Sequence, residues 1–138
     1  MSLYLKNGYL NFSYILGFGC PTTIIIGGRG TGKTYGALLD SIENNRKIIL
    51  MRRTQSQADL INKPEFSPIN PVAQDLGMPV VVKQISKYNS AIYLGEDEHV
   101  LGFTAALSTF SNLRGFDSSG VELLIYDEFI PEIHERPI

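Results

Sequence analysis

Residues 22–34 read Thr-Thr-Ile-Ile-Ile-Gly-Gly-Arg-Gly-Thr-Gly-Lys-Thr, a β-branched run that leads directly into a glycine-rich loop. Because β-branched side chains favour strands, residues 22–26 are expected to form a strand of the core sheet. The loop matches the pattern G-x-x-x-x-G-K-[ST] through Gly27, Gly32, Lys33 and Thr34. A helical pattern follows the loop, so the stretch predicts an α/β fold with a phosphate-binding loop.

Each residue type in this loop suits a bound triphosphate. Glycines let the backbone N–H groups turn inward, and the helix that follows adds its unpaired N-terminal N–H groups. Lys33 supplies a mobile positive charge for the β- and γ-phosphates, and the Thr34 hydroxyl can bind Mg²⁺. The expected cofactors are ATP and Mg²⁺. The expected nucleotide-binding residues are Gly27, Gly28, Arg29, Gly30, Thr31, Gly32, Lys33 and Thr34.

Hydrophobic periodicity and turn residues divide the rest of the chain. The expected elements are a short helix or irregular cover (8–18), a helix that stops at Asn44-Asn45 (33–44), a strand (47–51), a short helix (54–62), an irregular proline-rich excursion (64–79), an antiparallel meander (80–86, 90–94 and 100–105), a loop (108–120) and a last strand (121–126). Two strands joined by the first long helix predict a right-handed βαβ unit. We therefore expect a central, mostly parallel sheet with an antiparallel β-meander inserted into it.

Composition places the chain among ordinary globular domains. Its 138 residues, 43% of them hydrophobic, predict one domain over residues 1–138. The net charge of −2 provides no strong positive field of the kind expected of a nucleic-acid binder. The single cysteine, Cys20, is expected to be a buried thiol in a reducing compartment. No signal peptide or membrane span is apparent, so a cytoplasmic protein without a membrane partner is expected.

The last strand delivers two acids. Residues 121–126 are followed by Asp127 and Glu128. In sheets of this class, ligands lie beyond the carboxyl ends of the strands, so Asp127 is expected near Thr34 and Mg²⁺. Glu128 is then placed to act as a general base on the attacking water. The pair favours hydrolysis over phosphoryl transfer, and the Asn-Lys-x-Asp sequence that selects guanine is absent.

Taken together, these residues resemble a known family. The loop, Met-Arg-Arg-Thr at 51–54, Leu-Arg-Gly at 113–115 and Tyr-Asp-Glu-Phe-Ile at 126–130 are similar to the tailed-phage DNA-packaging ATPases. The likeness is to the compact encapsidation proteins, relatives of terminase large subunits. It implies an ASCE-type P-loop NTPase fold and an ATP-hydrolysing core that packages double-stranded DNA. The implied assembly is a homo-oligomeric ring on a phage portal or prohead, in the host cytoplasm during virion assembly.

The resemblance also implies roles for single residues. Lys33 and Thr34 would contact the phosphates and Mg²⁺, Asp127 would bind Mg²⁺, and Glu128 would be the catalytic base. Arg29 matches a loop arginine that stabilises or senses the γ-phosphate in the family, although a solvent-facing side chain is an equal alternative. Arg52 and Arg53 could reach nucleotide, DNA or a neighbouring subunit, or could form a solvated strand end. Arg114 could serve DNA or the next subunit.

The chain departs from the family after the acidic strand, because only ten residues follow Glu128. The family has further strands there, one of which inserts between the loop strand and the acidic strand. We therefore expect an incomplete C-terminal part. The gap would be filled by another chain, by direct pairing of the acidic strand with the loop strand, or by local disorder. His99 and His134 are expected in loops, and the acids near the C-terminus lack the partners of a zinc site.

Three functions stay open at this level. The first is the ATPase core of a viral DNA-translocation motor. The second is another ASCE ATPase, such as a helicase or an AAA+ remodeller. The third is a nucleotide-binding module without turnover.

Overall fold

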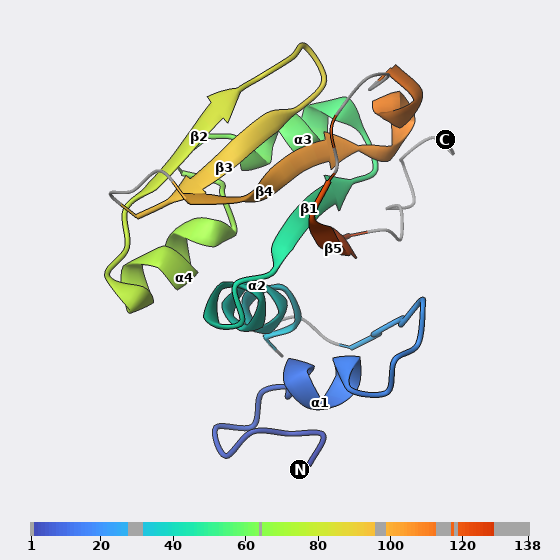
Figure 1. The fold of residues 1–138 in the computed structure, drawn as a ribbon, viewed down its shortest axis with the longest axis vertical. Helices are drawn as coiled ribbons and strands as arrows, with labels where there is room; N and C mark the ends of the chain where they lie inside the picture. Colours follow the sequence, from blue (N-terminus) through green and yellow to red (C-terminus); the bar gives the residue numbers. More distant parts are fainter. Residues whose placement is uncertain are drawn as a thin grey trace.

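A computed structural model describes residues 2–27, 32–63, 65–95, 99–112, 117 and 119–128. The chain is a mixed α/β protein built on one five-stranded sheet (Figure 1). The elements in chain order are α1 (Phe12–Leu16), α2 (Lys33–Glu43), β1 (Lys47–Arg52), α3 (Gln55–Ile61), α4 (Ile69–Leu76), β2 (Val80–Gln84), β3 (Ser90–Leu94), β4 (His99–Ala106), the 3-10 helix η1 (Leu107–Asn112) and β5 (Val121–Tyr126).

The strand order is β2-β3-β4-β1-β5. β1 pairs in parallel with both β4 and β5, whereas β2–β3 and β3–β4 pair antiparallel. The expected meander is confirmed, but its last strand pairs directly with β1. The expectation of a mostly parallel sheet is wrong, because parallel and antiparallel pairings are equal in number, whereas the meander belongs to the same continuous sheet as expected.

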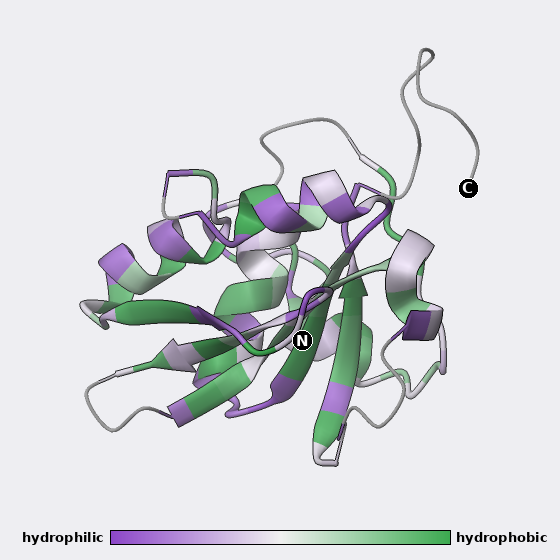
Figure 2. Cartoon of the chain, turned by 90° about the horizontal axis from the view of Figure 1, so that it is seen from above, coloured by the Kyte–Doolittle hydropathy of each residue, from purple (hydrophilic) through white to green (hydrophobic). Residues whose placement is uncertain are grey.

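The main core lies between one face of the sheet and three helices. Leu38 of α2, Ile61 of α3 and Val72 of α4 are buried in one cluster with Ile48 and Leu50 of β1. A smaller cluster on the other face of the sheet is formed by Ile49, Met51 and Ala105. Figure 2 shows hydrophobic residues dominating the strands, while the helices carry many hydrophilic residues. β1 lies between β4 and β5, and its carboxyl end is beside that of β5.

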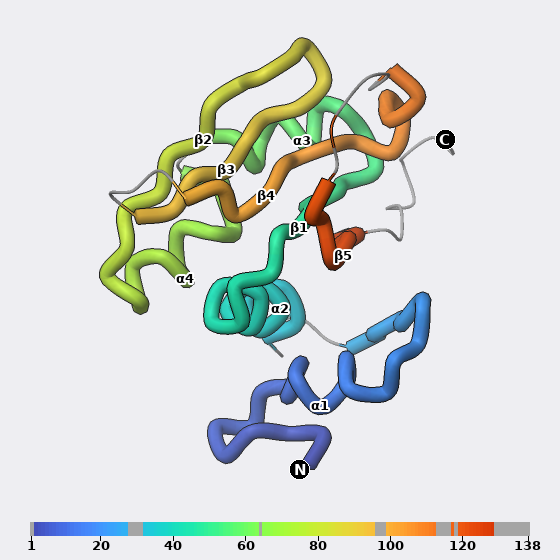
Figure 3. The backbone as a smooth tube through the Cα atoms, viewed as in Figure 1, coloured from blue at the N-terminus to red at the C-terminus, as the bar shows by residue number. Residues whose placement is uncertain are grey.

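The strand predicted at residues 22–26 does not form. Residues 22–27 belong to no strand, and Ile24 and Ile26 are 67% and 76% exposed. In Figure 3 they fall in the light-blue stretch before α2, separate from the strands of the sheet. The expected βαβ unit is therefore wrong as well. The physical reason is that a strand needs a partner edge, and β-propensity alone does not supply one.

The proline-rich excursion expected at residues 64–79 contains a helix instead. Pro68 is the N-cap of α4, and Pro71 lies in its first turn. Proline is tolerated there because the first N–H groups of a helix have no intrahelical partner. Gly77, at φ 65°, ends the helix in the left-handed region. The prolines therefore start this helix rather than prevent it.

The remaining local predictions are partly confirmed and partly wrong. α2 ends where the two asparagines were expected to stop it, and Asn45 has φ 52°. Cys20 is exposed, so the buried thiol is wrong. His99 begins β4 rather than lying in a loop, and η1 occupies the start of the expected 108–120 loop. Among the described residues, no helix has the length and apolar character needed to cross a bilayer.

Candidate functional site

The first turn of α2 meets the end of β5. The Thr34 hydroxyl donates to Asp127 Oδ1 across 3.0 Å, joining residues 93 positions apart in sequence. Asp127 is held by the backbone too, because its N–H donates to the Met51 carbonyl at 3.0 Å. The structure therefore brings together the hydroxyl and the carboxylate that the sequence predicted as metal ligands.

Lys33 lies at the same helix terminus. Its ammonium donates to the Gly27 carbonyl at 2.7 Å. Gly32 precedes it with φ 76°, a conformation that favours glycine. A Cβ on Gly32 would lie 2.9 Å from the Tyr9 ring, so the absence of a side chain lets that ring pack against the loop. Both constraints explain why this position carries glycine.

Arg52 links the two acids that follow β5. Its guanidinium lies 3.1 Å from Asp127 Oδ2 and 2.8 Å from Glu128 Oε2. The Arg52 side chain is only 13% exposed, whereas that of Glu128 is 62% exposed. Glu128 adopts φ 52°, and its N–H donates to Asp127 Oδ1 at 3.0 Å. The expected general base is thus held by a cation at the end of the neighbouring strand.

Sequence reasoning did not identify this contact. Arg52 and Arg53 were expected either to reach a ligand or to form a solvated strand end. The solvated strand end is wrong for both, since Arg52 is half-buried and Arg53 is 6% exposed. The signal that could have found Arg52 is its place directly after the expected strand 47–51, because the carboxyl ends of parallel strands meet at one edge of a sheet.

Several predicted site residues lie outside the described part of the chain. They are Gly28, Arg29, Gly30 and Thr31 of the loop, together with Arg114 and His134. The described site therefore consists of Gly27, Gly32, Lys33, Thr34, Asp127 and Glu128, with Arg52 added by the structure.

The donor atoms present suit Mg²⁺ in the company of phosphate. Magnesium is usually bound through one or two carboxylates, with phosphate and water completing its shell. The Thr34 hydroxyl and the Asp127 carboxylate already lie within 3.0 Å of each other. Within the described ranges, no group of three or more His, Cys, Asp or Glu side chains forms a separate metal site. The residues therefore fit a magnesium ion that is shared with a nucleotide.

Tyr35 follows Thr34 in the chain, but its side chain contacts α4 rather than the end of β5. Its hydroxyl donates to Asp75, near the end of α4. This hydrogen bond, helped by the negative charge of Asp75, raises the pKa of Tyr35 above its usual value. The Tyr9 and Tyr35 rings meet edge to face at a centroid distance of 6.4 Å. The first turn of α2 is thereby tied to α4 and to the N-terminal segment.

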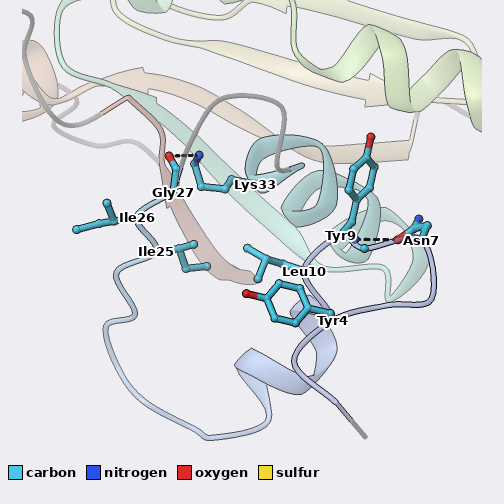
Figure 4. Close-up of a pocket in the computed structure, with 9 residues that line it drawn as sticks. Tyr4, Asn7, Tyr9, Leu10, Ile25, Ile26, Gly27 and Lys33 are labelled. Carbon is cyan, nitrogen blue, oxygen red and sulfur yellow. Dashed lines mark hydrogen bonds between the residues drawn. The ribbon is translucent and has the colours of Figure 1, made fainter.

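A cavity of about 350 Å³ lies beside the loop (Figure 4). Tyr4, Tyr9 and Leu10 of the N-terminal segment line it, together with Ile25 and Ile26 of residues 22–27. Lys33 closes it toward α2. Residues 22–27 thus lie against the N-terminal segment without filling the space between them.

No protein-family model matches this chain, and no curated protein or solved structure matches it either. The functional assignment therefore depends on the residues of this site and on their geometry.

Proposed function

We propose that the chain binds ATP with Mg²⁺ at the 27–34 loop and hydrolyses it. The observation that carries the proposal is the 3.0 Å contact between Thr34 and Asp127. The loop motif and the acidic strand end are far apart in sequence, yet Thr34 and Asp127 meet in space. A chance motif in a glycine-rich turn gives no reason for an acid 93 residues away to lie against its threonine.

The proposed roles follow from the chemistry of the side chains. Lys33 binds β- and γ-phosphate oxygens through charge-assisted hydrogen bonds. Thr34 and Asp127 would hold Mg²⁺, which neutralises charge on the phosphates when it is bound. Glu128 accepts a proton from the attacking water, provided that it leaves Arg52. Arg52 positions both carboxylates at the carboxyl end of β1 and β5.

The wider role we propose is the ATPase core of a viral double-stranded DNA packaging motor. The resemblance to packaging ATPases in the loop, in Met51–Thr54 and in residues 126–130 supports it. A homo-oligomeric ring on a phage portal follows from the same resemblance. Another ASCE ATPase, of helicase or AAA+ type, shares the same nucleotide chemistry. Stimulation of phosphate release by double-stranded DNA, and packaging into proheads, would separate the motor from these alternatives.

One observation favours a second function, nucleotide binding without turnover. Glu128 is paired with Arg52 at 2.8 Å, so the carboxylate oxygen that would accept a proton from water already contacts a cation. In this arrangement the chain could bind Mg-ATP and keep it intact. An Arg52→Met variant distinguishes the two functions, since it leaves Lys33 and Thr34 in place and removes the cation from Glu128.

The test measures binding and phosphate release together, with Mg-ATP, Mg-ADP and Mg-GTP. Lys33→Ala should abolish binding, and unchanged affinity in this variant would refute the loop assignment. Glu128→Gln should bind Mg-ATP and release no phosphate. Binding without release in the native chain, with release gained in Arg52→Met, would establish the non-hydrolysing module instead.

A further inference from the structure

A second cavity shares no residue with the candidate site. Its volume is about 390 Å³, and its lining comes from α3 with its C-cap and from the hairpin of β2 and β3. Most of the lining side chains are polar, among them Asp59, Asn62, Ser86, Lys87 and Asn89. Val82 is the one apolar side chain of the described lining, and no aromatic ring is present there on which a nucleobase could stack. Ligand pockets are usually lined mostly by apolar side chains, so this cavity suits a small ligand that is polar over most of its surface.

Asn89, which lines this cavity, has a buried donor without a partner. The residue is only 4% exposed. Ser86 Oγ accepts from the Tyr88 N–H at 3.1 Å and donates its own proton to Asn89 Oδ1. Asn89 Nδ2 has no hydrogen-bond partner in the described part of the chain. A buried donor left unpaired lowers stability, and an acceptor atom of a ligand would remove that penalty.

Asn62 repeats this arrangement at the end of α3. Thr104 Oγ1 accepts from the Ser90 N–H at 3.2 Å and donates to Asn62 Oδ1 at 2.9 Å. The oxygens of both carboxamides therefore already accept from hydroxyls, and each side chain can offer a ligand its NH₂ group. Carbonyl oxygens would suit a metal ion, whereas NH₂ groups suit the oxygens of a carboxylate. The two asparagines therefore favour an oxygen acceptor over a cation.

Two opposite charges belong to the same lining. Lys87, in the turn between β2 and β3, supplies an ammonium that also lies 5.6 Å from the centre of the Tyr88 ring. Asp59, on α3, supplies a carboxylate whose Oδ1 accepts from Gln55 at 2.8 Å, which leaves lone pairs for a further donor. A simple anion would be repelled by the carboxylate, and a simple cation by the ammonium. A ligand that carries both charges has a complementary partner for each.

We propose that this cavity binds a small zwitterion, the combination of carboxylate and ammonium that every free α-amino acid carries. The ligand carboxylate accepts from the NH₂ groups of Asn62 and Asn89 and from the ammonium of Lys87. The ligand ammonium donates to the Asp59 carboxylate. Because Asp59 and Lys87 are exposed, water screens their charges, and the dissociation constant should be about millimolar. Binding here bridges α3 and the hairpin and does not depend on the proposed nucleotide chemistry.

A titration of the isotope-labelled chain with glycine, followed by NMR, tests the proposal. Glycine carries both charges and has no side chain that could clash with the lining. Acetate supplies the carboxylate alone, methylammonium the ammonium alone, and glycerol a neutral polyol. The side-chain NH₂ resonances of Asn62 and Asn89 report directly on the two donors. Asp59→Asn removes the charge that faces the ligand ammonium, and Glu122→Gln, on exposed β5 surface outside the lining, is the matched control.

We expect glycine to shift both NH₂ resonances in a saturable manner, and each of the other three probes to bind at least about tenfold more weakly. Asp59→Asn should weaken glycine binding by at least about threefold, and Glu122→Gln should leave it unchanged. Asn89→Asp keeps the acceptor for Ser86, replaces the unpaired NH₂ by oxygen, and should abolish binding. Equal affinity for acetate and glycine would show a simple anion site, and equal affinity for glycerol a polyol site. Either result, or no saturable shift with glycine up to about 100 mM, would overturn the proposal.

Discussion

Replacing Arg52 by methionine tests how its two ion pairs differ in stabilising energy. The contact with Glu128 is the shorter, 2.8 Å against 3.1 Å for Asp127. Distance alone would rank Glu128 first. However, the Glu128 side chain is 62% exposed and that of Asp127 only 18% exposed, and water screens an exposed pair strongly. We therefore expect the longer pair to be the stronger one.

The magnitudes follow from burial. An exposed pair contributes about 0–1 kcal/mol, and we expect about 0.3 kcal/mol for Arg52–Glu128. The less exposed Arg52–Asp127 pair should contribute about 1–1.5 kcal/mol, since hydrogen bonds to charged groups are worth more when screening is reduced. Arg52→Met should then lower the free energy of unfolding by about 1–2 kcal/mol. For a chain of 138 residues, this is a fall in Tm of about 3–7 °C.

Two double-mutant cycles measure the pairs separately. One combines Arg52→Met with Asp127→Asn, and the other combines it with Glu128→Gln, with urea unfolding of all members. Raising the salt concentration should reduce the Glu128 coupling most, since exposed charges are screened first. A coupling energy larger for Glu128 than for Asp127 would show that distance rather than solvent exposure decides, and would refute this reasoning.

Three further predictions concern the surroundings of the site. Thr34→Ala should weaken Mg²⁺-dependent nucleotide binding by about tenfold or more while Thr34→Ser retains it, measured by titration with and without the metal. Gly36→Ala places a Cβ 2.8 Å from the Phe12 ring. Crowding should lower the free energy of unfolding by about 1–3 kcal/mol, which should outweigh the gain of about 1 kcal/mol from the higher helix propensity of alanine. Urea unfolding should show that adding Phe12→Leu reduces this loss. The raised pKa of Tyr35 implies a stabilising contribution that is complete below the usual tyrosine pKa and is lost as pH rises through the raised value. Tyrosinate absorbance should place the titration of Tyr35, identified with Tyr35→Phe, at lower pH in Asp75→Asn than in the native chain.

The helices and strands that could be predicted from sequence are those specified by a residue pattern within the element itself. α2, β1 and β5 each carry an uninterrupted pattern, and their bounds agree with expectation to within a residue. The meeting of Thr34 and Asp127 was predicted too, because Thr34 ends a loop motif and Asp127 directly follows an apolar strand. These predictions needed no knowledge of which strand lies next to which.

The failures depend on partners rather than on propensity. Residues 22–26 are all β-branched, yet none of the described strands pairs with them. Arg52 is polar at a strand end, and only the adjacency of β1 and β5 turns it into an ion-pair partner of two acids. Pro68 and Pro71 break helices in general, but at a helix start they do not. In each case the residue pattern alone does not say which other part of the chain the residue or segment will contact.

If the proposed function holds, substitutions of Lys33 and of Arg52 should act on different steps. The described site contains two cations and two carboxylates, and each cation is already occupied by the chain itself. Lys33 donates to the neutral Gly27 carbonyl, a weaker acceptor for an ammonium than a charged phosphate oxygen. Arg52 is held by two charged carboxylates, which a phosphate displaces only against strong competition. Lys33 should therefore respond first to nucleotide and control binding. Arg52 should release Glu128 only when further charge enters the site, and so control hydrolysis.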